Sequence, residues 1–125
     1  MKVIFLDIDG VLAIFKTWML YGSVFSSTPG VKNKLDPYGV EFIKLLELMG
    51  VKIVLSSTWR KGKTLAKLRK ILGINLHDKT CEHPFTGSVR GDEIHIWLKD
   101  NPQVTQFCII DDDSDMLPYQ MAHHV

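Results

Sequence analysis

Three short apolar runs, each followed directly by polar side chains, limit the possible folds of this chain more than any other feature. The runs cover residues 3–6, 51–55 and 107–110, and only Lys52 interrupts their apolar character. Runs without polar alternation predict strands that are buried on both faces of a parallel sheet. A weaker run over residues 74–76 predicts a fourth, short strand near an edge of that sheet.

Helical patterns lie between these runs. Over residues 37–49 apolar side chains recur at helical spacing, and Asp36 directly before them is a suitable N-cap. Residues 64–72 and 92–99 predict two further helices. This alternation predicts βαβ units with right-handed crossovers, and hence an α/β fold with a doubly wound parallel sheet and helices on both faces.

Length and composition favour one compact domain over residues 1–125. The chain has 125 residues, 46% of them hydrophobic and 23% charged, with a formal net charge of +1. A domain has about 150 residues, and a chain this apolar can bury a core, which excludes a disordered segment.

Cysteine usage and the absence of a long apolar stretch predict a cytoplasmic protein. Cys81 and Cys108 are too few for a disulfide framework, so we expect free thiols in a reducing compartment. Asp7 interrupts the first apolar run before a signal peptide could form. The longest uncharged stretch, residues 17–31, contains glycine and proline and falls short of the roughly 20 apolar residues of a membrane span.

Two carboxylates, Asp7 and Asp9, follow the first apolar run, and Gly10 allows the chain to turn sharply there. Neighbouring carboxylates repel each other, and a hard cation such as Mg²⁺ is the usual means of holding them together. An ordinary turn has the same spacing. A calcium loop is excluded because residues 13–15 supply none of the further oxygen ligands that such a loop needs.

The other two strands also end in polar residues. Ser56 and Ser57 follow the second run, Asp111 and Asp112 follow the third, and Arg90 comes just before a predicted helix. Ligands in a doubly wound sheet bind at the carboxyl ends of the strands. We therefore expect these side chains to converge on one site.

At this point the chain resembles the haloacid dehalogenase (HAD) superfamily of phosphotransferases, over essentially its whole length. The four motifs of that superfamily are matched in order by DIDGVL at 7–12, VLSS at 54–57, Arg90, and IIDD at 109–112. Three longer segments are similar to small phosphatase domains of the Swiss-army-knife group, which are associated with nucleic-acid repair. They are SSTWR at 56–60, RGDEI at 90–94 and DDDSDM at 111–116.

The resemblance implies a phosphomonoesterase that works through an aspartyl-phosphate intermediate. Asp7 would attack phosphorus, and Asp9 would protonate the leaving oxygen and later deprotonate the attacking water. Ser56 would hydrogen-bond the phosphoryl oxygens, with Ser57 or a backbone N–H as a second donor. Arg90 would offset the phosphoryl charge.

The cofactor implied is Mg²⁺, held by the four carboxylates Asp7, Asp9, Asp111 and Asp112. Beyond the four motifs, we expect Arg60 and Lys61 to bind substrate.

Several residues near the motifs leave alternatives open. The third motif of the superfamily is more often a lysine, so Lys61, Lys63 or Lys79 are alternatives to Arg90. Trp59 suits either stacking on a substrate or packing in the core. Asp113 and Asp115 are expected to cap the helix that follows them.

Neither gap between the motifs holds a cap domain: residues 11–36 have room only for a flap or loop, and a helix and a short strand account for most of residues 61–89. The site should therefore be open to a nucleotide or to a phosphorylated nucleic-acid end. The alternative is a regulatory or adaptor module that keeps the fold and binds metal or phosphorylated ligand without turnover. The intact pair Asp7 and Asp9 weighs against that alternative, and the oligomeric state is left open.

Overall fold

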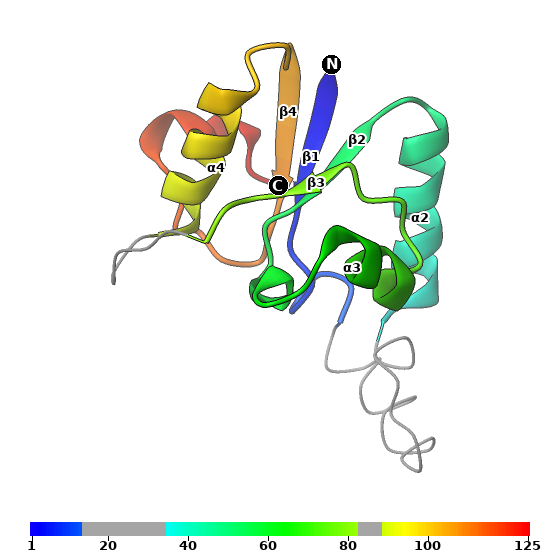
Figure 1. Cartoon of the computed structure of the whole chain (residues 1–125). Coiled ribbons are helices and arrows are strands. Elements are labelled where there is room, and N and C mark those ends of the chain that lie inside the picture. Colours follow the sequence, from blue (N-terminus) through cyan, green and yellow to red (C-terminus); the bar gives the residue numbers. More distant parts are fainter. Residues whose placement is uncertain (14–34, 83–88) are drawn as a thin grey trace.

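Four parallel strands form one sheet in the order β3-β2-β1-β4 in the computed structural model, which describes residues 1–13, 35–82 and 89–125 (Figure 1). The strands are β1 (Lys2–Leu6), β2 (Lys52–Leu55), β3 (Asp78–Lys79) and β4 (Gln106–Ile110). Leu6 at the end of β1 lies opposite Leu55 of β2 on one side and Ile110 of β4 on the other. The three strands therefore end side by side.

Helices cover both faces of the sheet. Helices α2 (Pro37–Leu48) and α3 (Leu65–Leu72) lie on one side, and α4 (Arg90–Asp100) lies on the other (Figure 1). Two short 3₁₀ turns, η3 (Thr58–Arg60) and η4 (Pro118–His123), follow β2 and β4 respectively. The predicted α/β class with a doubly wound parallel sheet is confirmed.

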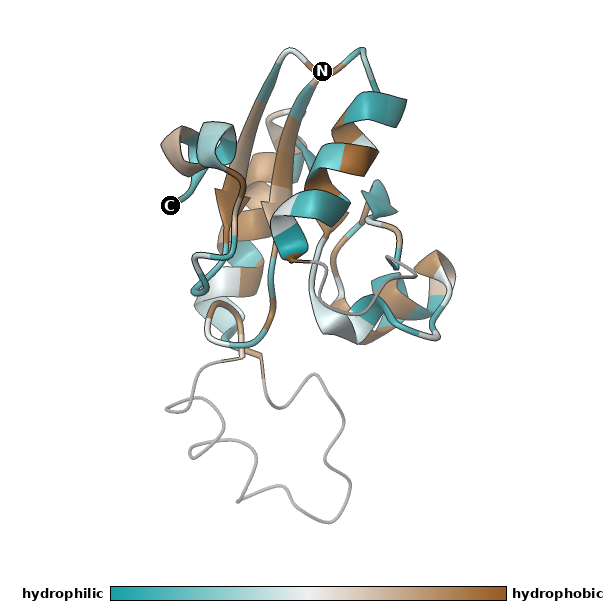
Figure 2. Ribbon diagram, turned by 90° about the vertical axis from the view of Figure 1, so that its left-hand side faces the viewer, coloured by the Kyte–Doolittle hydropathy of each residue, from teal (hydrophilic) through white to brown (hydrophobic). Residues whose placement is uncertain are grey.

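Alternate side chains of β1 belong to two separate hydrophobic cores. Ile4 and Leu6 pack with residues of α2 and α3, whereas Val3 and Phe5 pack with residues of α4. Successive side chains of a strand point to opposite faces, so a continuous apolar run serves both cores at once. The strands are accordingly brown along most of their length in Figure 2.

The fourth strand was predicted at the wrong place. The apolar residues 74–76 do not join the sheet, and the strand is Asp78–Lys79. Ile74 and Leu76 are buried in the core instead, and the backbone of His77 begins the pairing through a 2.8 Å bond to Ile53. An apolar run predicts burial, which Ile74 and Leu76 show. Backbone pairing with the sheet is made by the next segment, Asp78–Lys79.

The helices agree with the sequence patterns to within a few residues. Asp36 caps α2 by accepting a 3.2 Å hydrogen bond from the Gly39 N–H, and α4 begins at Arg90, two residues before its expected start. The expected flap falls mostly on residues 14–34, which lie outside the described residues. Within the described parts of the chain, no helix is both long enough and apolar enough to cross a membrane.

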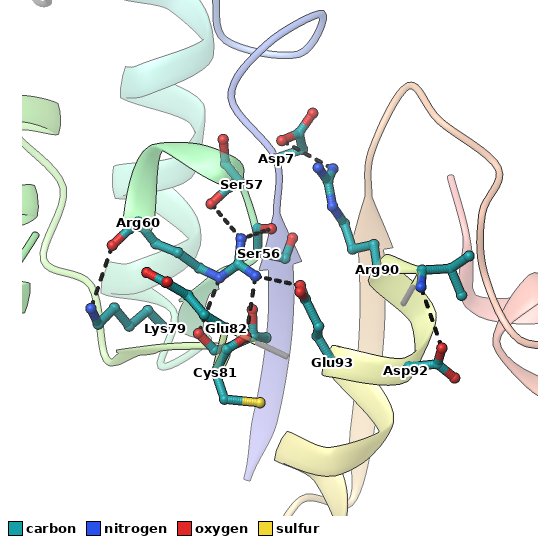
Figure 3. Close-up of polar contacts among 12 residues, drawn as sticks. Asp7, Ser56, Ser57, Arg60, Lys79, Cys81, Glu82, Arg90, Asp92 and Glu93 are labelled. Atoms are coloured by element: carbon teal, nitrogen blue, oxygen red, sulfur yellow. Dashed lines mark hydrogen bonds and ion pairs between the residues drawn. The ribbon is translucent and has the colours of Figure 1, made fainter. Parts of the chain in front are cut away.

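A buried arginine connects three separate segments around the sheet (Figure 3). The side chain of Arg60 is almost fully buried, with the residue 1% exposed, and all five of its N–H donors have partners. These partners are four backbone carbonyls and one carboxylate: Nε bonds Thr80 O, Nη1 bonds Ser56 O and Ser57 O, and Nη2 bonds Cys81 O and a Glu93 oxygen. Arg60 thus ties the end of β2 to the segment after β3 and to α4.

We expect Arg60→Met to lower the free energy of unfolding by about 3–5 kcal/mol, because it leaves the buried Glu93 carboxylate without its partner. Arg60→Lys should also destabilise the fold, since an ammonium cannot supply five donors in a plane. Denaturant unfolding measures both variants, with Lys61→Met as the control at the neighbouring exposed position. The account is contradicted if Arg60→Met costs no more than Lys61→Met.

Candidate active site

The site lies at the point of the sheet where successive strands of the chain stop being added on one side of β1 and the next strand is added on the other side. The chain runs outward from β1 to β2 and β3, then returns to place β4 on the opposite side of β1. The crevice between the carboxyl ends of β1 and β4 is the switch point at which doubly wound sheets bind ligands. Asp7 follows β1 at this point and Asp111 follows β4, and the two are 4% and 3% exposed.

Arg90 lies between these two buried carboxylates. Its Nη1 is 3.1 Å from Asp7 Oδ1 and also contacts Asp111 Oδ2, and Figure 3 shows the side chain reaching from α4 toward Asp7. Burial disfavours the Arg90 cation, but Asp111 and Asp7 outweigh it and raise the pKa of Arg90. Both contacts use Nη1, so Nε and Nη2 have no partner within the described parts of the chain and can face a bound anion.

The backbone at the start of α4 is anchored to the loop after β4. The N–H of Arg90 donates to Asp115 Oδ2 at 3.1 Å, and the N–H of Gly91 donates to the Asp115 carbonyl at 3.1 Å. A Cβ on Gly91 would lie 2.6 Å from the backbone nitrogen of Leu117, so a larger residue would separate the two segments. Asp115 therefore caps α4, which precedes it in the sequence. The expectation that Asp115 caps the helix that follows it is wrong. The unpaired N–H groups at the start of α4 need acceptors, and Asp115 supplies them.

Three carboxylates form a group that can hold a cation. One oxygen from each of Asp7, Asp111 and Asp112 lies within 4.8 Å of the others. Gly10 makes room for this group, because a Cβ there would lie 2.1 Å from Asp112 Oδ2, and its φ of +79° suits glycine. Hard carboxylate oxygens are the donors that Mg²⁺ prefers, so the residues present fit that ion. The carboxylate of Asp9 lies outside this group.

Burial changes the acidity of Asp7. The pKa of the Asp7 carboxyl is raised to about 6, chiefly by burial; Arg90 limits this rise, Asp111 adds to it, and the Ile8 backbone and the Ser57 side chain also lower the pKa. The Asp7 carboxylate is largely shielded from water, and the ion pair with Arg90 holds it in place. The arrangement suits a nucleophile that must meet an anionic phosphorus centre beside a positive charge.

The two serines after β2 have different surroundings, although both are fully buried. The Oγ of Ser57 accepts a 3.3 Å hydrogen bond from the Trp59 backbone N–H, and the Ser57 side chain lowers the pKa of Asp7. The Oγ of Ser56 has no hydrogen-bond partner among the described residues. Of the two hydroxyls, that of Ser57 is thus the one that affects the acidity of Asp7.

Asp9 has a partner that sequence reasoning did not find. The indole Nε1 of Trp59 donates a 3.1 Å hydrogen bond to Asp9 Oδ2, across 50 residues of sequence. Trp59 is half-buried and packs against the larger core, whereas Asp9 is exposed. The two alternatives expected for Trp59 were stacking and core packing, and no local pattern indicates a bond between such distant positions.

The basic residues near η3 are not all available to a substrate. Arg60 was expected to bind substrate, but its five donors are used within the fold, so this expectation is corrected. Lys63 Nζ bonds the Trp59 carbonyl at 3.0 Å, and Lys79 Nζ bonds the Lys63 carbonyl at 2.6 Å. Lys61 is exposed. Arg90 is therefore the basic side chain that contacts Asp7 within the part of the chain described.

Comparison with known proteins shows the family of the chain. No curated protein matches the chain. A family model described as the HAD domain in Swiss Army Knife RNA repair proteins matches residues 3–125, which include all four motifs and every strand but the first residue of β1. The resemblance drawn from the motifs is confirmed, and the chain belongs to the family of HAD domains of Swiss Army Knife RNA repair proteins.

Proposed function

We propose that this domain is a phosphomonoesterase that forms an aspartyl-phosphate on Asp7 and acts on a phosphorylated nucleic-acid end or a nucleotide. Membership of the HAD family supports a hydrolase in general terms. The observation that carries the finer proposal is the contact between buried Asp7 and Arg90 at the switch point of the sheet. It sets the nucleophile that would receive the phosphoryl group beside a cation that can bind the phosphoryl oxygens.

In the first displacement an Asp7 oxygen bonds to phosphorus while the bond from phosphorus to the ester oxygen breaks. Asp9 gives a proton to that leaving oxygen, which would otherwise depart as an alkoxide. In the second displacement water attacks phosphorus, Asp9 takes a proton from the water, and the bond between phosphorus and Asp7 breaks. Phosphate leaves, and both aspartates return to their starting states.

The remaining side chains stabilise the charge on the phosphoryl oxygens. Arg90 offers Nε and Nη2 in one plane, the geometry that binds two phosphate oxygens together. The hydroxyls of Ser57 and Ser56 are placed at the end of β2 as further donors. Mg²⁺ bound by Asp7, Asp111 and Asp112 would supply positive charge that offsets these carboxylates and the phosphoryl oxygens.

Asp7→Asn should reduce kcat by at least about 10³-fold, because an amide cannot replace a covalent nucleophile. The fold should persist, since the change preserves shape and removes a buried charge. Phosphate release from p-nitrophenyl phosphate measures the effect, and circular dichroism checks the fold. Asp100→Asn at the exposed end of α4 is the matched control and should keep full activity. Activity above a few per cent in Asp7→Asn would favour the alternative of a binding module contaminated by another phosphatase.

The substrate class rests on the family description and on the surface beside the site. Lys61 is exposed and directly follows the η3 turn, whose Trp59 reaches Asp9. A phosphorylated oligonucleotide carries further phosphates that an exposed lysine can contact, whereas a small aryl phosphate carries none.

We expect kcat/KM for a phosphorylated oligonucleotide to fall steeply with salt, and kcat/KM for p-nitrophenyl phosphate to change little. Lys61→Glu should weaken only the first reaction and reduce the slope of its log–log salt plot by about 0.7, the value for one single-strand phosphate contact. Lys52→Glu, at the opposite end of the sheet, is the matched control. The proposal of a nucleic-acid substrate is wrong if mononucleotides are far better substrates than any oligonucleotide and Lys61→Glu lowers kcat/KM equally for the oligonucleotide and for p-nitrophenyl phosphate.

A further inference from the structure

The bond between Trp59 and Asp9 is held by a rigid support. Trp59 lies in η3, where its backbone N–H bonds Ser57 Oγ at 3.3 Å and its carbonyl accepts from Lys63 Nζ at 3.0 Å. The next residue, Arg60, is fixed through all of its donors, as described above. The ring packs against the larger core. The indole N–H therefore has little freedom to move away from Asp9.

Asp9, in contrast, lies on an exposed turn. The turn is closed by a 3.0 Å bond from the Gly10 N–H to the Ala13 carbonyl, which joins backbone atoms only and does not hold the Asp9 side chain. Trp59 Nε1 is the hydrogen-bond partner of that carboxylate within the described residues. Without the indole, the exposed Asp9 side chain would populate several rotamers.

We propose that Trp59 is a positioning residue that fixes the orientation of Asp9 for proton transfer, an inference that rests on the proposed function. An indole nitrogen can only donate, and the carbonyl oxygen of a carboxylic acid is a better acceptor than its hydroxyl oxygen, so the bond to Oδ2 favours the acid form with its proton on Oδ1. The proton of the acid form is therefore on Oδ1. It passes from Oδ1 to the leaving ester oxygen, and Oδ1 later takes a proton from the attacking water, so the two displacements leave Asp9 unchanged.

This role has a consequence for the choice of substrate. An alkoxide, such as the oxygen of a ribose hydroxyl, is a poor leaving group and needs a well-placed acid. The p-nitrophenolate ion is stable and needs almost none. Loss of the Trp59 N–H should therefore penalise alkyl phosphates much more than activated aryl phosphates. A loss of core packing alone would lower both reactions by the same factor.

The test compares two Trp→Phe variants across a series of phosphate esters whose leaving groups become progressively less acidic. Trp59→Phe keeps an aromatic ring and removes the N–H. Trp97→Phe is the matched control, because Trp97 Nε1 also donates to a carboxylate, Asp78 Oδ2 at 2.7 Å, in a bond from α4 to β3 that does not involve Asp9. We expect Trp59→Phe to reduce kcat/KM, which reports the first displacement, by less than about threefold on p-nitrophenyl phosphate and by about tenfold or more on an alkyl phosphate. Trp97→Phe should leave the dependence on the leaving group unchanged.

A second measurement does not depend on turnover. The chain has three tryptophans, so its ¹⁵N–¹H spectrum has three indole signals, which single Trp→Phe variants assign. Asp9→Ala should shift the Trp59 indole proton upfield and leave that of Trp97 in place. An unmoved Trp59 signal, or an equal loss of kcat/KM on every ester, overturns the positioning role. An inactive wild-type protein in which the signal still shifts overturns the proposed function instead, and the positioning role with it.

Discussion

Two buried carboxylates lie beside each other at the end of the sheet, and the guanidinium of Arg90 between them makes this possible. Asp7 and Asp111 are almost fully buried, and like charges so close would favour protonation or separation. Arg90 contacts both through one nitrogen. The position of Arg90, and therefore of the first turn of α4, is the constraint on which the rest of the site depends.

The neighbouring structure fixes that turn from three directions. Asp115 accepts from the backbone at the start of α4, and the buried side chain of Gln120 donates to the Gly91 carbonyl at 2.9 Å. Glu93, one turn further along α4, pairs with Arg60. Through Arg60 the same helix is tied to the carbonyls of the serines after β2. The cation, the nucleophile and the hydroxyl donors thus belong to one connected polar network beneath the site.

Features that depend on local pattern could be predicted from the sequence. The three apolar runs predict the main strands, because a strand buried on both faces needs apolar residues without alternation. The parallel arrangement of those strands then brings Asp7, Ser57 and Asp111 to one edge. Thr64 and Gly73 bound α3 as N-cap and C-cap, both of which have short-range sequence signals.

Features that depend on distant partners could not be predicted. Arg60 follows the serine motif and looked like a substrate ligand, yet its carboxylate partner, Glu93, is 33 residues away. The bond from Trp59 to Asp9 spans 50 residues, and Asp115 caps a helix that begins 25 residues earlier. A sequence shows which residue types are present, but the partner that each of these side chains selects is decided by the packing of the sheet and its helices.

The central claim is that a phosphoryl group passes through Asp7, and trapping that intermediate tests it most directly. Asp9→Asn should slow hydrolysis of the intermediate while p-nitrophenyl phosphate, which needs little acid, still delivers its phosphoryl group. Acid quenching and peptide mass spectrometry should then find one phosphoryl group on the peptide containing Asp7, in the presence of Mg²⁺ and not in excess chelator. Substrate turnover with no phosphorylated peptide, or with the phosphoryl group on another residue, would contradict the account.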